Sequence, residues 1–409
     1  MKNDKNRKIN RNLFQAHFLS IVFCFWFSMF IYVQTFGVYL AFLDFGYYAT
    51  GIIMGSYGIM QIILRFPIGF LADRYQISGK FLVGIGFIAS LASVLLLALS
   101  TEFLPIFMGR FLAGFTAAMW VVLTIWYSSS FSKQQSLKAM SQLQYTMVGS
   151  QLISMVLSGL IADFYGFTYL FWVGAVFASL GFILVLLLPN QEPKRAQESI
   201  QMKHAPIFDR IIRIRKIWSL SILSLIGHAV LFTTIFGFSS VYFTQLNEHQ
   251  SAIMFLVVSF MLPHGMAPLI LSIKKSQLKN SFKLLMLCFV VGISTLLFLG
   301  SIDSWVMYCI LHGILGLSLG FVFPILLDEV YKADEVGASK TIMGLYQSVY
   351  SIGIVAGPIV AGYFALKVEI GAVFILSAFL LLLGGILSLV ESVKLSKGKG
   401  EIGEKVKSI

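Results

Sequence analysis

The sequence predicts an all-α membrane protein with twelve transmembrane helices arranged as two six-helix halves. Three observations predict this class: twelve long apolar segments, a one-sided distribution of basic residues, and one long polar stretch near the middle of the chain. Of the 409 residues, 58% are hydrophobic and only 12% are charged, and the mean hydropathy is +0.86. Soluble chains carry about 25% charged residues, so this chain lacks the polar surface that it would need in water. Its solvent must therefore be the lipid bilayer.

Twelve segments are long enough to cross the membrane as helices. Each offers about 20 mostly apolar residues, which is the length that spans the hydrocarbon core. The segments lack the alternating polarity of membrane-spanning strands, and backbone groups in lipid must be bonded within their own segment, so helices are predicted. The predicted spans are 14–40, 48–72, 81–100, 103–129, 138–162, 167–188, 217–243, 250–273, 282–300, 304–327, 341–366 and 370–391.

The basic residues predict the orientation of these spans. With the N-terminus placed inside, 27 of the 30 Lys and Arg residues fall in cytoplasmic segments, and only Lys367 falls outside. Arg65 and Arg110 lie within predicted helices. Cytoplasmic loops of membrane proteins carry this excess of positive charge, so we expect both termini in the cytoplasm of a multi-pass cell (plasma) membrane protein. The net charge of +12 therefore reports topology, and nucleic acid is not an expected partner.

The longest polar stretch predicts the division of the chain. It covers 190–216 and lies between the sixth and seventh spans, which leaves six spans on each side. An even division around a cytoplasmic loop indicates parallel repeats. Within the loop, residues 207–216 fit either a short amphipathic surface helix or a solvated linker. The predicted units are an N-terminal bundle (1–189), a cytoplasmic linker (190–216), a C-terminal bundle (217–393) and a cytoplasmic tail (394–409).

A short internal similarity supports the duplication. The fourth span carries Arg110-Phe-Leu-Ala-Gly114, and the tenth span carries His312-Gly-Ile-Leu-Gly316 at the corresponding place. Both segments put a glycine one turn after a polar residue. Because glycine is common in membrane helices for close packing, this similarity alone is only suggestive.

The loop after the second span carries a family motif. It reads Gly69-Phe-Leu-Ala-Asp73-Arg74 and continues to Gly79-Lys80, which resembles the helix 2–3 signature of the major facilitator superfamily. The resemblance implies two six-helix bundles related by a pseudo-two-fold axis along the membrane normal. It also implies a latch, in which Gly69 allows close helix approach and Asp73 caps the positive N-terminal end of the eleventh helix near 339–341. The alternative is that Asp73 and Arg74 are ordinary interfacial charges.

Two further segments resemble motifs of the same superfamily. In the fourth span, Arg110 is followed by a face of small residues within 109–118. In the eleventh span, 353–362 contains Gly357-Pro358 and is similar to the pattern GxxxGPxxGG. In the drug–proton antiporters of the family this pattern belongs to the fifth helix, which lacks the proline here. The motif therefore supports the superfamily without assigning the antiporter branch.

Two arginines inside predicted helices are candidate functional residues. A charged side chain in lipid costs several kcal/mol unless it faces a partner or water. Arg110 lies roughly 10 Å from the start of its helix, so we expect it to line the cavity or join a proton-coupling network rather than snorkel. Arg65 follows Tyr57 and Gln61 at four-residue intervals. Its side chain either reaches the cytoplasmic interface or serves the site, and the sequence leaves both open.

In the superfamily, helices 1, 4, 7 and 10 line the substrate cavity, with contributions from 2, 5, 8 and 11. For each polar residue on these spans, packing against a neighbouring helix is the alternative role. Carboxylates are missing from the middle of the spans, so buried histidines, including His264, are the next candidates for proton coupling. Arg110 without such a carboxylate favours an anionic or neutral substrate. The predicted cavity residues are Gln34, Tyr57, Arg110, Trp120, Gln144, His228, His312 and Tyr346.

These observations predict a secondary transporter that moves a small organic solute by alternating access. The helix 2–3 motif and the compact loops favour efflux, and coupling to protons is one option. The alternatives are uptake of a sugar or organic anion by symport or uniport, and a non-transporting sensor or lipid-handling protein. The sequence carries no HExxH, GxSxG or Walker A pattern, so an enzyme is not expected. We expect no cofactor or metal, a small-molecule substrate, protons if transport is coupled, the lipid bilayer as surroundings, and a monomer.

Overall fold

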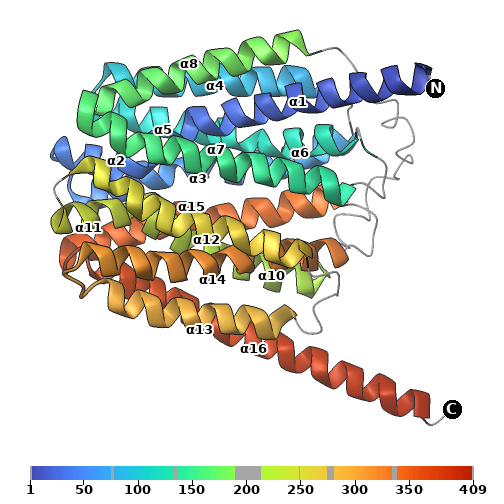
Figure 1. The fold of residues 1–409 in the computed structure, drawn as a ribbon. Helices are drawn as coiled ribbons and strands as arrows, with labels where there is room; N and C mark the ends of the chain where they lie inside the picture. Colours follow the sequence, from blue (N-terminus) through green and yellow to red (C-terminus); the bar gives the residue numbers. More distant parts are fainter. Residues whose placement is uncertain are drawn as a thin grey trace.

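The protein is a bundle of long, nearly parallel helices (Figure 1). The computed structural model describes residues 2–74, 78–129, 131, 136–188, 213–247, 249–273, 281–333 and 339–407. Within these ranges, twelve helical segments are long and apolar enough to cross a membrane, and they coincide with the twelve predicted spans to within a few residues at each end.

The first six spans are built from eight helices. They are α1 (Lys2–Phe30) with α2 (Val33–Phe42), α3 (Tyr47–Arg74), α4 (Gly79–Leu99), α5 (Phe103–Ala118) with α6 (Trp120–Ser129), α7 (Ser136–Tyr165) and α8 (Phe167–Leu187).

The last six spans follow the same plan. They are α10 (Arg215–Thr233) with η3 (Thr234–Phe238) and α11 (Ser239–Leu246), then α12 (Ile253–Ile273), α13 (Ser281–Leu299), α14 (Trp305–Lys332), α15 (Ser339–Lys367) and α16 (Ala372–Lys407). A short 3-10 turn, η4 (Gln250–Ala252), precedes α12.

Three spans that the sequence presents as continuous are interrupted. The first breaks at 31–32, the fourth breaks at Met119, and the seventh contains the π-helical turn η3. Hydropathy does not register such breaks, because the residues on both sides are apolar. These three spans are also the most deeply buried of the described chain. Irregular backbone at membrane depth is tolerated where protein surrounds it, and π-helical turns are frequent at functional sites.

The two halves repeat the same helix pairings. In the first half α3 packs on α5, α4 on α8 and α1 on α7; in the second, α12 packs on α14, α13 on α16 and α10 on α15. The short internal similarity has the same spatial role in both halves. Gly114 of α5 lies against the carbonyl oxygen of Tyr57, and Gly316 of α14 lies against the carbonyl oxygen of Phe260. This pairing confirms two six-helix bundles related by a pseudo-two-fold axis.

The halves meet along two symmetry-related helix pairs. The α3–α15 pair makes the most extensive contact between any two elements, and the α7–α12 pair is its counterpart. Figure 1 shows α3 and α15 side by side where the blue-green half meets the yellow-red half. In addition, α2 packs against η3 and α11, so the interrupted parts of the first and seventh spans lie at this interface.

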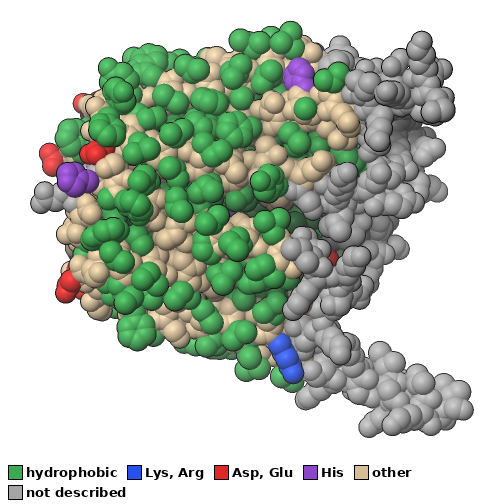
Figure 2. Space-filling view, in the orientation of Figure 1, with side chains coloured by type: hydrophobic (Ala, Val, Ile, Leu, Met, Phe, Trp, Pro, Cys, Tyr) green, Lys and Arg blue, Asp and Glu red, His purple; other side chains and the backbone are tan. Residues whose placement is uncertain are grey.

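The predicted linker 190–216 falls almost entirely outside the described residues, and α10 begins at Arg215, within its last two residues. The predicted tail starts as helix, because α16 continues to Lys407. Figure 1 shows that both ends of the described chain lie at the same end of the molecule, as the charge distribution predicted. Figure 2 shows a side surface dominated by hydrophobic side chains, with acidic residues gathered at the opposite end of the molecule.

Candidate functional site

Arg110 is buried in the first bundle beside Tyr57, a ring that stacks on Phe232 of α10 in the second bundle. It lies on α5, only 2% of it is exposed, and its Nη1 donates a hydrogen bond to the Tyr32 hydroxyl at 3.3 Å. The guanidinium carbon lies 4.4 Å from the centre of the Tyr57 ring and 5.6 Å from that of Phe36. Within the described residues no carboxylate lies at ion-pairing distance, and Nε has no hydrogen-bond partner. The side chain therefore does not snorkel to the surface, and its charge is surrounded by aromatic rings.

Arg65 is a second buried cation, at the interface between the halves. It lies on α3 and is 3% exposed, which rules out the reach to the cytoplasmic interface that the sequence left open. Its Nη1 donates to Ser351 Oγ of α15 at 3.2 Å, and its guanidinium carbon lies 5.0 Å from the centre of the Tyr350 ring. Its Nε also lacks a partner among the described residues.

An aromatic and imidazole cluster on the second half faces Arg65. The His228 ring of α10 stacks on Tyr350 with centroids 3.8 Å apart and planes 5° apart. His228 Nδ1 donates to the Ser224 carbonyl at 2.8 Å, and the Tyr346 hydroxyl donates to Ser224 Oγ at 2.8 Å. Two predicted cavity residues, His228 and Tyr346, therefore share one cluster that continues through Tyr350 to Arg65 of the other half.

Within the described part of the chain, three buried amides on helices that meet at the contact between the halves have unpaired atoms. Gln34 of α2 is fully buried, and neither atom of its side-chain amide has a hydrogen-bond partner among the described residues. Gln61 donates to the Tyr57 carbonyl, but its Oε1 is unpaired. The Oε1 of Gln347 on α15 is unpaired as well. Buried polar atoms are almost always bonded, so a group of exceptions at one interface requires a functional explanation.

His312, also predicted for the cavity, belongs to a separate and satisfied cluster. Its Nδ1 contacts the Tyr308 carbonyl at 2.9 Å and its Nε2 contacts Ser239 Oγ at 2.9 Å. The Tyr308 hydroxyl donates to the Ser239 carbonyl at 3.0 Å. His312 thus ties α14 to the start of α11, just after the π-helical turn. Both ring nitrogens of His312 therefore have partners.

Two other predicted cavity residues make no direct contact with the arginines among the described residues. Trp120 is buried at the start of α6, where it packs edge-to-face on Trp26 with centroids 5.2 Å apart. Gln144 is half-buried on α7, and no ring or hydrogen-bond contact of the described residues connects it to the arginines. Tyr350, by contrast, contacts both Arg65 and His228 and was not among the predicted cavity residues.

The predicted gating residues have mixed placements. Gly69 is buried near the cytoplasmic end of α3, and α15 begins at Ser339 as expected. The side chains of Asp73 and Arg74 lie outside the part that the structure describes, so the latch stays a prediction. Gly357 allows close approach of α10, because a Cβ there would lie 2.7 Å from the Ala229 carbonyl oxygen. The carbonyl of Pro358, its neighbour, contacts Gly51 of the other half.

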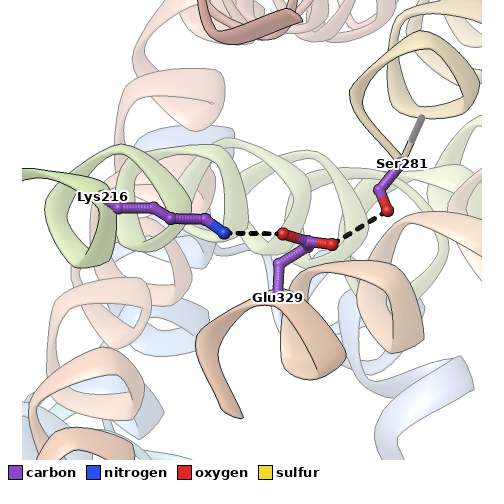
Figure 3. A network of polar contacts seen from close by, with 3 residues as sticks. All are labelled: Lys216, Ser281 and Glu329. Carbon is purple, nitrogen blue, oxygen red and sulfur yellow. Dashed lines mark hydrogen bonds and ion pairs between the residues drawn. The ribbon is translucent and has the colours of Figure 1, made fainter. Parts of the chain in front are cut away.

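A polar clamp joins three helices at one end of the second bundle. Glu329 near the end of α14 accepts from Lys216 Nζ at 2.8 Å and from Ser281 Oγ at 2.9 Å (Figure 3). The three residues begin or end α10, α13 and α14, so the clamp holds three helices together. It lies within one half, and its role is therefore to keep that half rigid.

A sequence profile of the Major Facilitator Superfamily matches residues 16–333. The chain belongs to the major facilitator superfamily. This membership, together with the relatives below, identifies a transporter and not an enzyme.

The chain is also similar to two transporters and to one solved structure. The inner membrane transport protein YajR of Escherichia coli K12 is 24% identical over 342 residues, which are 81% of this chain and 72% of YajR. An uncharacterized transporter of Buchnera aphidicola from Schizaphis graminum is 28% identical over 169 residues, covering 40% of this chain and only 42% of that protein. A bacterial homologue of the human lysosomal transporter Spinster, in an inward-facing and unoccupied conformation, superposes with a TM-score of 0.75 at 12% identity. The superposition covers 95% of this chain and 98% of the chain in that structure, so the two proteins share a fold.

Proposed function

We propose that this superfamily transporter moves a small organic solute by alternating access, with the solute held between the two halves near Arg110 and Arg65. The observation that carries this proposal is the set of buried, unpaired polar groups at that interface. They come from both halves: Arg110, Gln34 and Gln61 from the first, and Gln347 from the second.

Unpaired polar groups in a membrane protein need a compensating role. Each costs stability when it is buried without a partner, and ionisable residues at membrane depth characteristically mark substrate pathways. In transporters built from repeats, the substrate site lies near the bilayer midplane at the repeat interface. We propose that the unpaired groups here mark that site, because a solute that bonds to them would supply the missing partners.

The movement would follow the division of the chain. We propose that the bundles 1–189 and 217–393 rock as rigid bodies about the α3–α15 and α7–α12 contacts, with 190–216 as a cytoplasmic linker. Asp73 would then stabilise the state closed on the cytoplasmic side by capping α15. Both termini are placed in the cytoplasm, and the chain acts as a monomer in the cell membrane.

The direction that we propose is export, on the basis of the helix 2–3 motif. Proton coupling, where present, would use His228, because it contacts Tyr350 and through it reaches Arg65. Uptake of an organic anion is the second candidate, and the two buried arginines without carboxylate partners are the observation that favours it.

The test is transport by purified protein in proteoliposomes with an imposed pH gradient. Solutes from a panel of metabolites and drugs should cross faster than in empty vesicles, and Arg110→Gln should abolish the difference. Arg215→Gln is the matched control, because Arg215 is exposed at the cytoplasmic start of α10. Transport that persists when the gradient is collapsed would indicate a uniporter. Absence of transport across the whole panel would contradict the proposal and favour a sensor.

A further inference from the structure

We infer that the transported solute is a small organic anion with a flat body, and that its carboxylate binds between Arg110 and Arg65. This inference rests on the proposed function, because it names the substrate class of the same site. It adds the charge of the solute, its shape, and the two side chains that select for both.

The first step is that the site holds two positive charges without a counter-ion. Arg110 and Arg65 are 2% and 3% exposed, and neither has a carboxylate at ion-pairing distance within the described residues. Buried charges in proteins are normally paired, because the desolvation cost is several kcal/mol per ion. Two such ions in one interface leave the site short of negative charge. An anionic solute is the partner that would remove this deficit.

The second step is that the two guanidinium groups approach the same part of α3. Arg110 lies over the Tyr57 ring at 4.4 Å. Arg65 bonds Ser351, whose carbonyl oxygen would lie 3.0 Å from a Cβ at Gly58, the residue after Tyr57. Both side chains come from the first half: Arg110 lies over Tyr57, and Arg65 bonds a residue of the second half whose backbone packs on the neighbouring Gly58. A solute between them would touch both halves, which alternating access requires.

The third step is that both arginines keep free donors. A guanidinium carries five N–H groups in a planar fork that matches a carboxylate. Arg110 uses Nη1 for Tyr32, Arg65 uses Nη1 for Ser351, and both Nε groups are unpaired among the described residues. Neither arginine is committed to the two-bond pairing for which this side chain is suited. That pairing remains available to a ligand.

The fourth step concerns the shape of the solute. Aromatic rings surround the arginines: Tyr32, Phe36 and Tyr57 around Arg110, and Tyr350 beside Arg65. Cation–π contacts contribute about 0.5–2 kcal/mol, which is less than a desolvated ion pair with a carboxylate provides, so a carboxylate can displace them. The ring faces that the guanidinium groups leave would then contact the body of the solute. A flat or aromatic body fits such walls best, because stacked and edge-to-face contacts are the geometries that aromatic rings prefer.

A purely structural role explains these residues less well. Among the described residues, Arg110 bonds only to Tyr32 of its own half, and Arg65 makes a single bond across the interface. A glutamine at either position could form one such bond without burying a charge. The charge itself is therefore unexplained by the contacts that the protein makes, and substrate recognition explains it.

The test compares three probes of nearly equal shape: benzoate, its neutral amide benzamide, and the cation benzamidine. Binding is followed by thermal shift and calorimetry on the detergent-purified, full-length protein. We expect benzoate to bind at least tenfold tighter than either of the other two. Arg110→Gln and Arg65→Gln should each weaken benzoate binding by roughly ten- to hundredfold, as expected for the loss of a charge-assisted bond. Neither substitution should weaken benzamide binding, and Arg215→Gln should leave all three affinities unchanged.

Lysine variants keep the test informative where a glutamine variant fails to fold. Arg110→Lys and Arg65→Lys retain the charge but lose the fork, so they should keep the preference for benzoate with reduced affinity. Equal binding of the three probes, a preference for benzamide, or no benzoate binding at about 10 mM would overturn the inference. Transport of neutral solutes that survives Arg110→Gln would overturn the anion site and leave the transporter function standing. Absence of any transport would instead contradict the proposed function.

Discussion

A methyl group added to the contact between α3 and α15 is expected to part the two helices at whichever end it is placed. The two ends of the contact therefore predict opposite effects. At the outer end, Gly51 lies so close to the backbone of Pro358 that a Cβ would overlap the carbonyl oxygen and come within 3.0 Å of the carbonyl carbon. At the cytoplasmic end, a Cβ at Gly344 would lie 3.1 Å from the Arg65 carbonyl oxygen and 3.3 Å from Phe66 Cα. We therefore expect Gly51→Ala to part the outer ends of the helices and Gly344→Ala to part the cytoplasmic ends.

The magnitude follows from what the methyl group meets. At both positions the obstacle is backbone, which cannot rotate away as a side chain can. Overpacking of a close contact costs typically about 1–3 kcal/mol, and the severe overlap at Gly51 places it in the upper part of that range. Such an energy shifts an equilibrium between two conformations by roughly 5- to 150-fold. Gly344→Ala has milder overlaps, so its shift should be about 1 kcal/mol in the opposite direction.

Cross-linking at the outer end measures this shift. Tyr48 and Tyr363 are half-exposed, and their ring centroids lie 6.1 Å apart across the α3–α15 contact. Cysteines at these two positions, in a chain whose three buried native cysteines are replaced by serine, should cross-link readily. Gly51→Ala should slow this cross-link at least fivefold, whereas Gly344→Ala should leave it unchanged or faster.

Gly149→Ala is the matched control, because no atom lies within 4 Å of a Cβ there. If the Gly51→Ala variant cross-links as fast as the Gly149→Ala variant, the reasoning is refuted. It would mean that the helices adjust locally without moving apart.

Two further substitutions test the energetics of the buried charges by thermal unfolding. Arg110→Met should leave the melting temperature unchanged or raise it. The buried unpaired charge costs several kcal/mol, which outweighs the roughly 1.5–3 kcal/mol that the bond to Tyr32 contributes. A fall of about 10 °C in the melting temperature would contradict an uncompensated charge. Glu329→Gln should destabilise the protein by about 1 kcal/mol, since it weakens the 2.8 Å pair with a Lys216 side chain that is 36% exposed. Glu391→Gln, in a more exposed pair, should cost less than Glu329→Gln, and equal effects would count against the clamp.

The sequence predicted the spans well because lipid imposes a simple rule on them. Twenty apolar residues in a row can only be a buried or lipid-facing helix, and the spans of the structure begin and end within a few residues of that prediction. The interruptions at 31–32, Met119 and η3 were missed for the same reason. They change the hydrogen-bond pattern of the backbone without changing its hydropathy. Only the packing of the surrounding helices decides where such breaks occur.

The candidate site was predictable only in part. Arg110 was identifiable, because a charge in an apolar span is conspicuous. Arg65 was ambiguous, because residue type and depth cannot say whether a long side chain extends toward the membrane centre or toward the surface. The structure resolves this by its bonds to Ser351 and its contact with Tyr350, both on α15. Contacts between spans so distant in sequence depend on the tertiary arrangement, which one sequence does not encode as a pattern.

The pseudo-symmetry separates what the fold requires from what the site requires. At equivalent places, Gly114 meets the Tyr57 carbonyl and Gly316 meets the Phe260 carbonyl, so the close approach of the helices is common to both halves. The preceding polar residues differ. Arg110 is charged and keeps free donors, whereas His312 has contacts at both ring nitrogens. Because backbone packing is retained and side-chain chemistry is not, the charge at position 110 is not a demand of the fold. The first half would therefore hold the anionic group of the solute between its two arginines, and Tyr350 of the second half would add an aromatic wall beside Arg65.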